Sequence, residues 1–180
     1  WYNGDSSNTD RIGYSRTLTD GTPGTLDHED AHTVEVGLFG WFFEKTVENL
    51  STGDYPATVA APGDTLRYSI RLQTTDGPLA DFRFYDDLGA MNASAVFSPG
   101  TLRLVPSTVP PGADVSNMDP TGGTNSAGVV DIRNLDLSAF SEVTIQFDVT
   151  LQAAILDGTI VTNQADLLGT AGAPLALSDD

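Results

Sequence analysis

The sequence predicts an all-β protein, an immunoglobulin-like antiparallel β-sandwich of about seven strands. Three observations predict this fold. Apolar and polar residues alternate with a period of two over several short segments, no long segment has a helical period, and clusters of Gly, Pro, Asn and Asp separate the alternating segments. Short half-buried strands joined by such turns are typical of two packed antiparallel sheets.

We expect each alternating segment to form one strand, and the first of these strands, in chain order, is an opening strand around Lys45. A long polar loop over residues 106–127 is expected to be an excursion at one end of the sandwich, and a closing strand is expected over residues 158–165. In each strand the apolar residues share one face, which we expect to face the core. The most regular alternation covers residues 66–72, 82–85, 102–104 and 143–151.

The chain is expected to be one piece of a tandem array. Gly21–Asp30 loosely echoes Gly169–Asp180, and a repeated segment at such a distance is typical of repeat proteins. We therefore expect residues 1–38 to be the tail of a preceding module or a linker, residues 39–168 to be the sandwich domain, and residues 169–180 to be a linker to the next module.

The composition narrows the choice of partners. There are 25 acidic and 8 basic residues, which give a net charge of -17, so the composition argues against nucleic acid and anionic membranes as partners. No run is apolar enough for this segment to insert into a membrane. The acidity favours an extracellular, saline or calcium-containing environment. No cofactor is expected to be required, with calcium left open.

Lys45 is the only lysine, and it lies in the most apolar stretch of the chain, residues 38–47. Burial disfavours an ammonium group unless a partner or a reaction compensates for the lost hydration. The function that the sequence suggests therefore depends on which residues Lys45 faces.

Several motifs occur in a fixed order between residues 43 and 168. The motifs are Lys45 in an opening strand, Ala61–Ile70, Phe82–Leu88, Val143–Thr150 and Gly158–Ala165. Together they resemble the conserved-repeat domain of bacterial and archaeal surface proteins, a family that is similar to the isopeptide-forming immunoglobulin-like domains of Gram-positive adhesins and pilins. The family's usual pattern has Thr, Pro and Thr where this chain has Asp87, Gly89 and Gln164, and it has an Asn-Thr-Gly where this chain has Thr74–Gly77.

The resemblance implies a structural or stalk module of a repetitive cell-surface adhesin, located outside the cell. Its partners would be neighbouring repeats of the same polypeptide and a host or surface ligand. It also implies a cross-link between Lys45 and Asn163, with Asp86 as the catalytic residue, formed in a single turnover and not by an enzyme that turns over.

Strand alternation points to the same three residues independently. It places Lys45, Asp86 and Asn163 on the inward faces of their strands. A buried amine loses its proton and becomes a nucleophile, while a buried carboxyl gains one and can polarise a carboxamide. Lys45 would then attack the side chain of Asn163 with loss of ammonia. The alternative is a pair of Lys45 and Asp86 that hydrogen-bonds Asn163 without reacting.

Other residues point to other functions. A binding module would hold a ligand or calcium in its loops, above all in residues 106–127. His28, Glu29 and His32 match the pattern of a zinc protease, but that pattern requires a helix, and its surroundings here are typical of a strand and turns. A calcium site between modules could use the nearby acidic residues, Asp27, Glu29 and Asp30.

Two further patterns carry less weight. Adjacent Asp86 and Asp87 point to opposite faces of a strand, which argues against a glycosidase pair. Asn49 and Asn92 each begin an Asn-X-Ser glycosylation sequon, which is a frequent coincidence.

Overall fold

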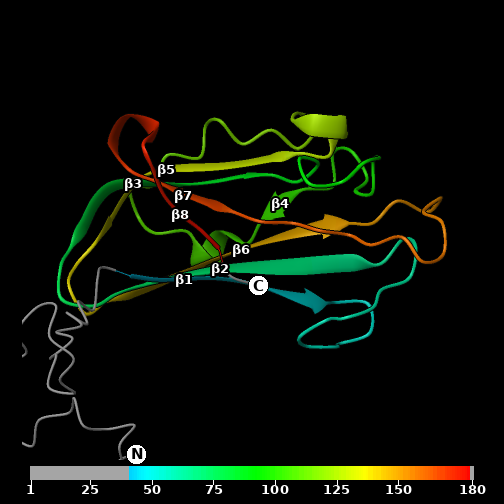
Figure 1. Ribbon diagram of the computed structural model, residues 1–180, viewed down its shortest axis with the longest axis horizontal. Coiled ribbons are helices and arrows are strands. Elements are labelled where there is room, and N and C mark those ends of the chain that lie inside the picture. The colour runs from blue at the N-terminus through cyan, green and yellow to red at the C-terminus, as the bar shows by residue number, and fades with distance from the viewer. Residues whose placement is uncertain (1–40, 179–180) are drawn as a thin grey trace, which may run out of the picture. The chain divides into compact units, whose positions relative to one another are not determined.

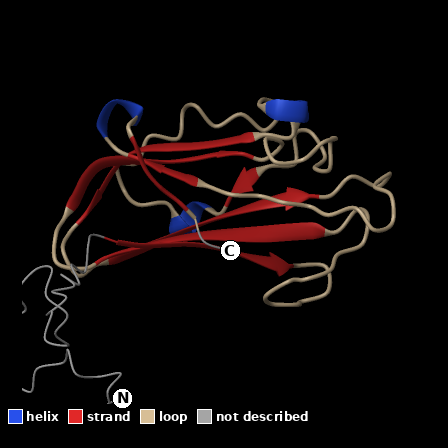
Figure 2. Ribbon diagram, in the orientation of Figure 1, coloured by secondary structure: helices blue, strands red, loops and turns tan. Residues whose placement is uncertain are grey.

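A computed structural model describes residues 41–178, which form a β-sandwich of two antiparallel sheets with four strands each (Figure 1). The strand order is β1-β2-β6-β4 in the first sheet and β5-β3-β7-β8 in the second. Figure 2 shows strands in both layers and helix only in short turns. The strands are β1 (Trp41–Asn49), β2 (Thr65–Thr74), β3 (Leu79–Asp87), β4 (Arg103–Leu104), β5 (Val129–Leu137), β6 (Glu142–Thr150), β7 (Asp166–Leu168) and β8 (Pro174–Leu177). The turns are the 3-10 helices η2 (Pro106–Thr108), η3 (Thr124–Ser126) and η4 (Thr170–Gly172).

The first sheet follows the predicted alternation. Strand β2 lies between β1 and β6, and its inward residues are paired with inward residues of its neighbours, as in Ile70 with Lys45 and Ile145. The outward residues are polar or charged and pair across strands, as in Arg67 with Asp148. The four predicted inward residues of β2 are buried: Leu66, Tyr68, Ile70 and Leu72.

The second sheet contains strands that the sequence did not predict. Strand β5 was missed because its alternation breaks at Asn134, whose φ of 55° lies in the left-handed region, and the pairing with β3 shifts register there. Strand β8 was missed because Pro174–Leu177 is short and wholly apolar. Since β8 pairs with β7, the segment 169–180 that was predicted to be a linker belongs to the sandwich as far as Leu177. The predicted segment 1–38 lies outside the described residues.

The loop over residues 106–127 lies along β5. The sequence had predicted instead that this loop would be an excursion at one end of the sandwich. Its backbone forms bridges at Asp114 with Arg133 and at Asp119 with Val129, on β5. An uncovered edge strand would expose unpaired backbone groups, so the loop covers that edge of β5.

The core lies between the two sheets and is rich in aromatic residues. The rings of Phe43 on β1 and Phe84 on β3 stack across the sandwich with centroids 5.7 Å apart. Tyr68 on β2 stacks on Phe147 of β6 at 5.4 Å. Within residues 41–178, no helix has the length and the apolar character needed to cross a membrane.

Candidate functional site

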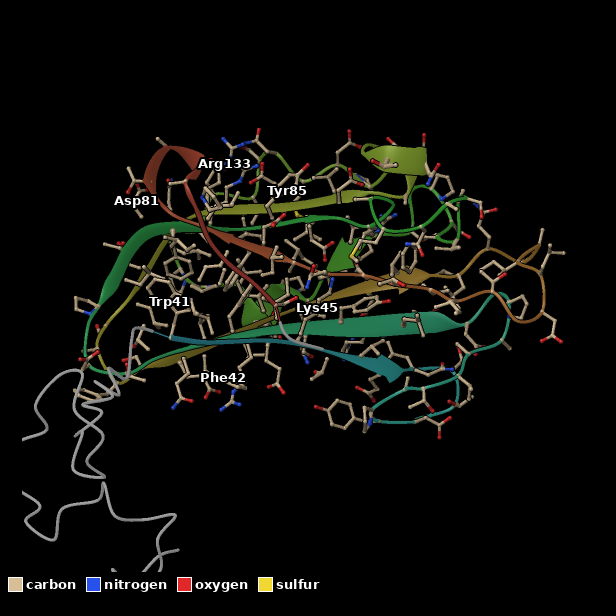
Figure 3. All side chains as sticks on the ribbon, viewed as in Figure 1. Trp41, Phe42, Lys45, Asp81, Tyr85 and Arg133 are labelled. Atoms are coloured by element: carbon tan, nitrogen blue, oxygen red, sulfur yellow. The ribbon has the colours of Figure 1, made fainter. Side chains whose placement is uncertain are left out.

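Lys45 points into this aromatic core from the middle of β1. It shares the inward face of the strand with Phe43, and only 2% of its surface is exposed. Figure 3 shows Lys45 between the two sheets, whereas Phe42 lies on the outer side of β1. The Lys45 Nζ atom lies 4.8 Å from the ring centroid of Tyr68 and 5.7 Å from that of Phe147. The amine is therefore held against aromatic faces that favour a cation, in a region that water hardly reaches.

Asp86 meets Lys45 from the opposite sheet. It follows Phe82 and Phe84 on the inward face of β3 and has no exposed surface. Its Oδ2 atom lies 2.5 Å from Lys45 Nζ, and its Oδ1 atom has no hydrogen-bond partner. Burial raises the pKa of the Asp86 carboxyl above its ordinary value, and the neighbouring Lys45 opposes that rise. The carboxyl is thus suited to carry a proton.

Asn163 completes the cluster, although it does not lie on a strand. The predicted closing strand over 158–165 is irregular, and regular pairing begins only at Asp166. Asn163 is nevertheless turned inward, with 7% of its surface exposed. Its Nδ2 atom donates to Asp86 Oδ2 at 3.3 Å. The structure thus brings together the three side chains that the sequence singled out.

A pocket of about 340 Å³ adjoins the cluster. Lys45 and Asn163 line it, together with Pro56 and Ala57 of the β1–β2 loop. A water molecule occupies about 30 Å³ in the liquid, so a small molecule such as ammonia has ample room beside Asn163.

The two sequon asparagines have structural roles. Asn49 is fully buried, and its side chain donates to Asp64 and accepts from the backbone of Ser51. Asn92 is 9% exposed, and its carboxamide hydrogen-bonds the backbone of Thr162, next to Asn163. Sequence reasoning missed this contact, because the sequon was the only signal at Asn92.

The remaining sequence candidates stand apart from this cluster. Asp87 points to the outer side of β3, opposite to Asp86, and binds the backbone and hydroxyl of Thr124. The histidines at 28 and 32 and the acidic residues between 27 and 30 lie outside the described residues. Among residues 41–178, no group of three or more His, Cys, Asp or Glu side chains is arranged to hold a metal ion.

No known protein family matches the chain, and no curated protein does. Among solved structures, the chain is similar to the yeast delta-COP-I mu-homology domain, with 15% sequence identity and a TM-score of 0.39. The match covers 76% of this chain and 46% of that one, so the chain spans about half the length of the structure that it matches.

Proposed function

We propose that this chain is a structural module whose sandwich is locked by an autocatalytic isopeptide bond between Lys45 and Asn163. The observation that carries the proposal is the position of Asp86 Oδ2, which contacts Lys45 Nζ at 2.5 Å and Asn163 Nδ2 at 3.3 Å inside an aromatic core. One carboxyl therefore touches both the nucleophile and the leaving group.

The reaction needs no partner beyond these three side chains. Lys45 gives a proton to Asp86, which leaves a neutral amine beside a carboxylic acid. Nζ then attacks Cγ of Asn163, and a new N–C bond forms as the Cγ–Nδ2 bond breaks. A proton from Nζ reaches Nδ2 through Asp86, ammonia leaves, and Asp86 keeps the proton with which it began the attack. Lys45 and Asn163 end as one secondary amide.

Burial and the adjoining pocket favour the reaction. Burial favours the neutral amine and the neutral acid over the ion pair, and it raises the pKa of Asp86. A protonated Asp86 can donate its O–H to the Asn163 carboxamide oxygen after a half-turn of the amide group, which would polarise the carbonyl under attack. The adjoining pocket gives the ammonia a place to go.

The bond would join the two sheets. Lys45 belongs to the first sheet, and Asn163 leads into β7 of the second. By the chain-entropy argument developed for disulfides, closing the loop from 45 to 163 contributes about 4–5 kcal/mol. Tension that enters at β1 would pass directly to the segment before β7, so the intervening strands would carry little load. Such a property suits a stalk.

The arrangement of the strands supports an immunoglobulin-like assignment. The sheet β1-β2-β6-β4 corresponds to the A-B-E-D sheet of that fold, and β3-β7-β8 corresponds to its C-F-G sheet, with β5 added at the edge. We place the module in a repetitive, extracellular surface protein, where its partners are neighbouring repeats and a host or surface ligand.

Intact mass spectrometry of the purified chain tests the proposal. The protein should weigh less than its sequence by one ammonia, because condensation expels one. The deficit should disappear in Lys45→Ala, Asn163→Ala and Asp86→Ala, and a tandem spectrum should show the peptide of Lys45 joined to that of Asn163. A wild-type mass equal to the sequence mass would mean that the three side chains form an unreacted, hydrogen-bonded ion pair.

A further inference from the structure

The segment that carries Asn163 has little backbone support of its own. Residues 160–164 belong to no strand, and Leu156 and Ile160 nearby are 80% and 85% exposed. Within the described part of the chain, the hydrogen bonds to backbone atoms of residues 160–164 both come from the side chain of Asn92.

The Asn92 carboxamide makes two hydrogen bonds to the backbone of Thr162. Its Nδ2 atom donates to the Thr162 carbonyl at 2.8 Å, and its Oδ1 atom accepts from the Thr162 N–H at 3.0 Å. A neighbouring strand would offer the same donor and acceptor to Thr162. The side chain thus substitutes for a missing strand partner at the residue before Asn163.

Asn92 is itself held in place. The Nδ2 atom of Asn92 also donates to the Leu88 backbone carbonyl at 3.2 Å. The backbone carbonyl of Asn92 accepts from Asn125 Nδ2 at 3.1 Å. Leu88 is fully buried and lies two residues after Asp86. The hydrogen bonds of the Asn92 side chain therefore connect the backbone beside Asn163 to the end of β3, the strand that holds Asp86.

We infer that Asn92 is a positioning residue for the cross-linking reaction, which keeps Asn163 Cγ within reach of Lys45 Nζ and Asp86. The inference rests on the proposed function. Asn92 touches neither reacting atom, so it acts through Thr162. A misplacement of about 1 Å can slow a reaction by about a hundredfold, so losing both contacts should slow cross-linking by about tenfold or more.

Cell-free translation gives the test, with aliquots quenched in denaturant and weighed over time. Loss of ammonia should be at least about tenfold slower in Asn92→Ala than in wild type. Thr74→Ala is the matched control, because Thr74 is also buried and its hydroxyl donates to the carbonyls of Ser138 and Ser141, in the turn between β5 and β6. It should lower the melting temperature similarly and leave the rate near that of wild type. Asn92→Asp keeps the acceptor for Thr162 and should react at an intermediate rate.

A second readout does not depend on the reaction. In Lys45→Met protein, which cannot cross-link, the side-chain amide protons of Asn163 should give one sharp pair of resonances that broadens when Asn92→Ala is added. Equal rates in wild type and Asn92→Ala, or equal slowing in Asn92→Ala and Thr74→Ala, would overturn the inference and leave the proposed function standing. If wild type never loses ammonia, the proposed function fails instead, and unchanged Asn163 resonances would overturn the positioning role as well.

Discussion

Two buried aspartates on the second sheet point to opposite faces of that sheet, and their pKa values are shifted in opposite directions. Asp86 on β3 points inward, and Asp131 on β5 points outward, beneath a pair of arginines. The side chain of Asp86 has no exposed surface and that of Asp131 is 5% exposed. Burial acts to raise the pKa of both, yet the pKa of Asp86 is raised and that of Asp131 is lowered.

The difference lies in the number and kind of hydrogen-bond donors. Asp131 accepts four hydrogen bonds of 2.6–3.0 Å from the guanidinium groups of Arg83 and Arg133, two from each. These outweigh the cost of burial. Asp86 accepts from Lys45 and Asn163 at one oxygen, and its other oxygen has no partner. A buried carboxylate with every lone pair engaged is inert, whereas one with an orphaned oxygen is ready to take a proton.

The two clusters also differ in what they connect. Arg83 and Asp131 join β3 to its neighbour β5 within one sheet, while Lys45 and Asp86 join β1 to β3 across the core. Strands within a sheet are already held by backbone hydrogen bonds, so a covalent bond adds most where those bonds are absent. That difference makes the inner cluster the better place for a cross-link.

Removing the cation from each cluster should give the largest contrast. Lys45→Met should lower the free energy of unfolding by about 4–5 kcal/mol, because the proposed cross-link can then no longer close the loop from 45 to 163. Arg83→Met should lower it by about 2 kcal/mol, because Asp131 loses charge-assisted hydrogen bonds but keeps those of Arg133. Denaturant unfolding measures both. Similar losses in the two variants would argue against a covalent bond at Lys45.

The pH dependence of stability should have opposite signs at the two aspartates. Since the pKa of Asp131 is lowered in the folded state, its contribution is present above the unfolded pKa of about 4 and is lost as the pH falls through the folded value. Since the pKa of Asp86 is raised, its contribution is present below about pH 4 and is lost as the pH rises through the folded value.

Melting temperatures across the pH range test these signs in Lys45→Met protein, where no cross-link can hide them. Adding Asp131→Asn should remove the loss of stability that occurs as the pH falls into the acid range. Adding Asp86→Asn should instead remove the decline that begins as the pH rises above about 4. If Asp86→Asn left the profile unchanged, the carboxyl would not be a proton carrier held neutral by burial.

Much of the sandwich could be predicted because its central strands alternate strictly. In β2 and β6 each inward residue is apolar, apart from Thr74 at the end of β2, and each outward residue is polar or charged, so period and burial agree. Strand β5 could not be predicted in this way, because a left-handed residue at Asn134 shifts its inward set by one position. Strand β8 could not be predicted either, because its alternation is absent and its leucines stay partly exposed.

The site was accessible to the same reasoning only where its residues lie on strands. Lys45 and Asp86 follow the alternation of β1 and β3, so their inward direction could be read from the sequence. Asn163 was placed inward on the expectation of a strand that does not form. Its direction is set by contacts between distant segments, among them that of Thr162 with Asn92, which local periodicity cannot reveal.

The smallest effect is expected at Asp87, the neighbour of Asp86 on the opposite face of β3. Its carboxylate accepts from the Thr124 N–H at 2.9 Å and from the Thr124 hydroxyl at 2.9 Å, and so fastens the end of the loop over residues 106–127 to β3. Gly123 lets the loop approach, because its φ is 73° and a Cβ there would collide with Asp87 and Val129. Asp87→Ala should therefore cost about 1–2 kcal/mol and expose the loop to proteolysis, while the ammonia deficit stays complete. Measured beside Asp86→Ala, which should abolish that deficit, it tests the register of β3 directly. If Asp87 proved necessary for the deficit and Asp86 did not, the inward and outward faces of this strand would have to be exchanged, and the carboxyl in the core would be Asp87.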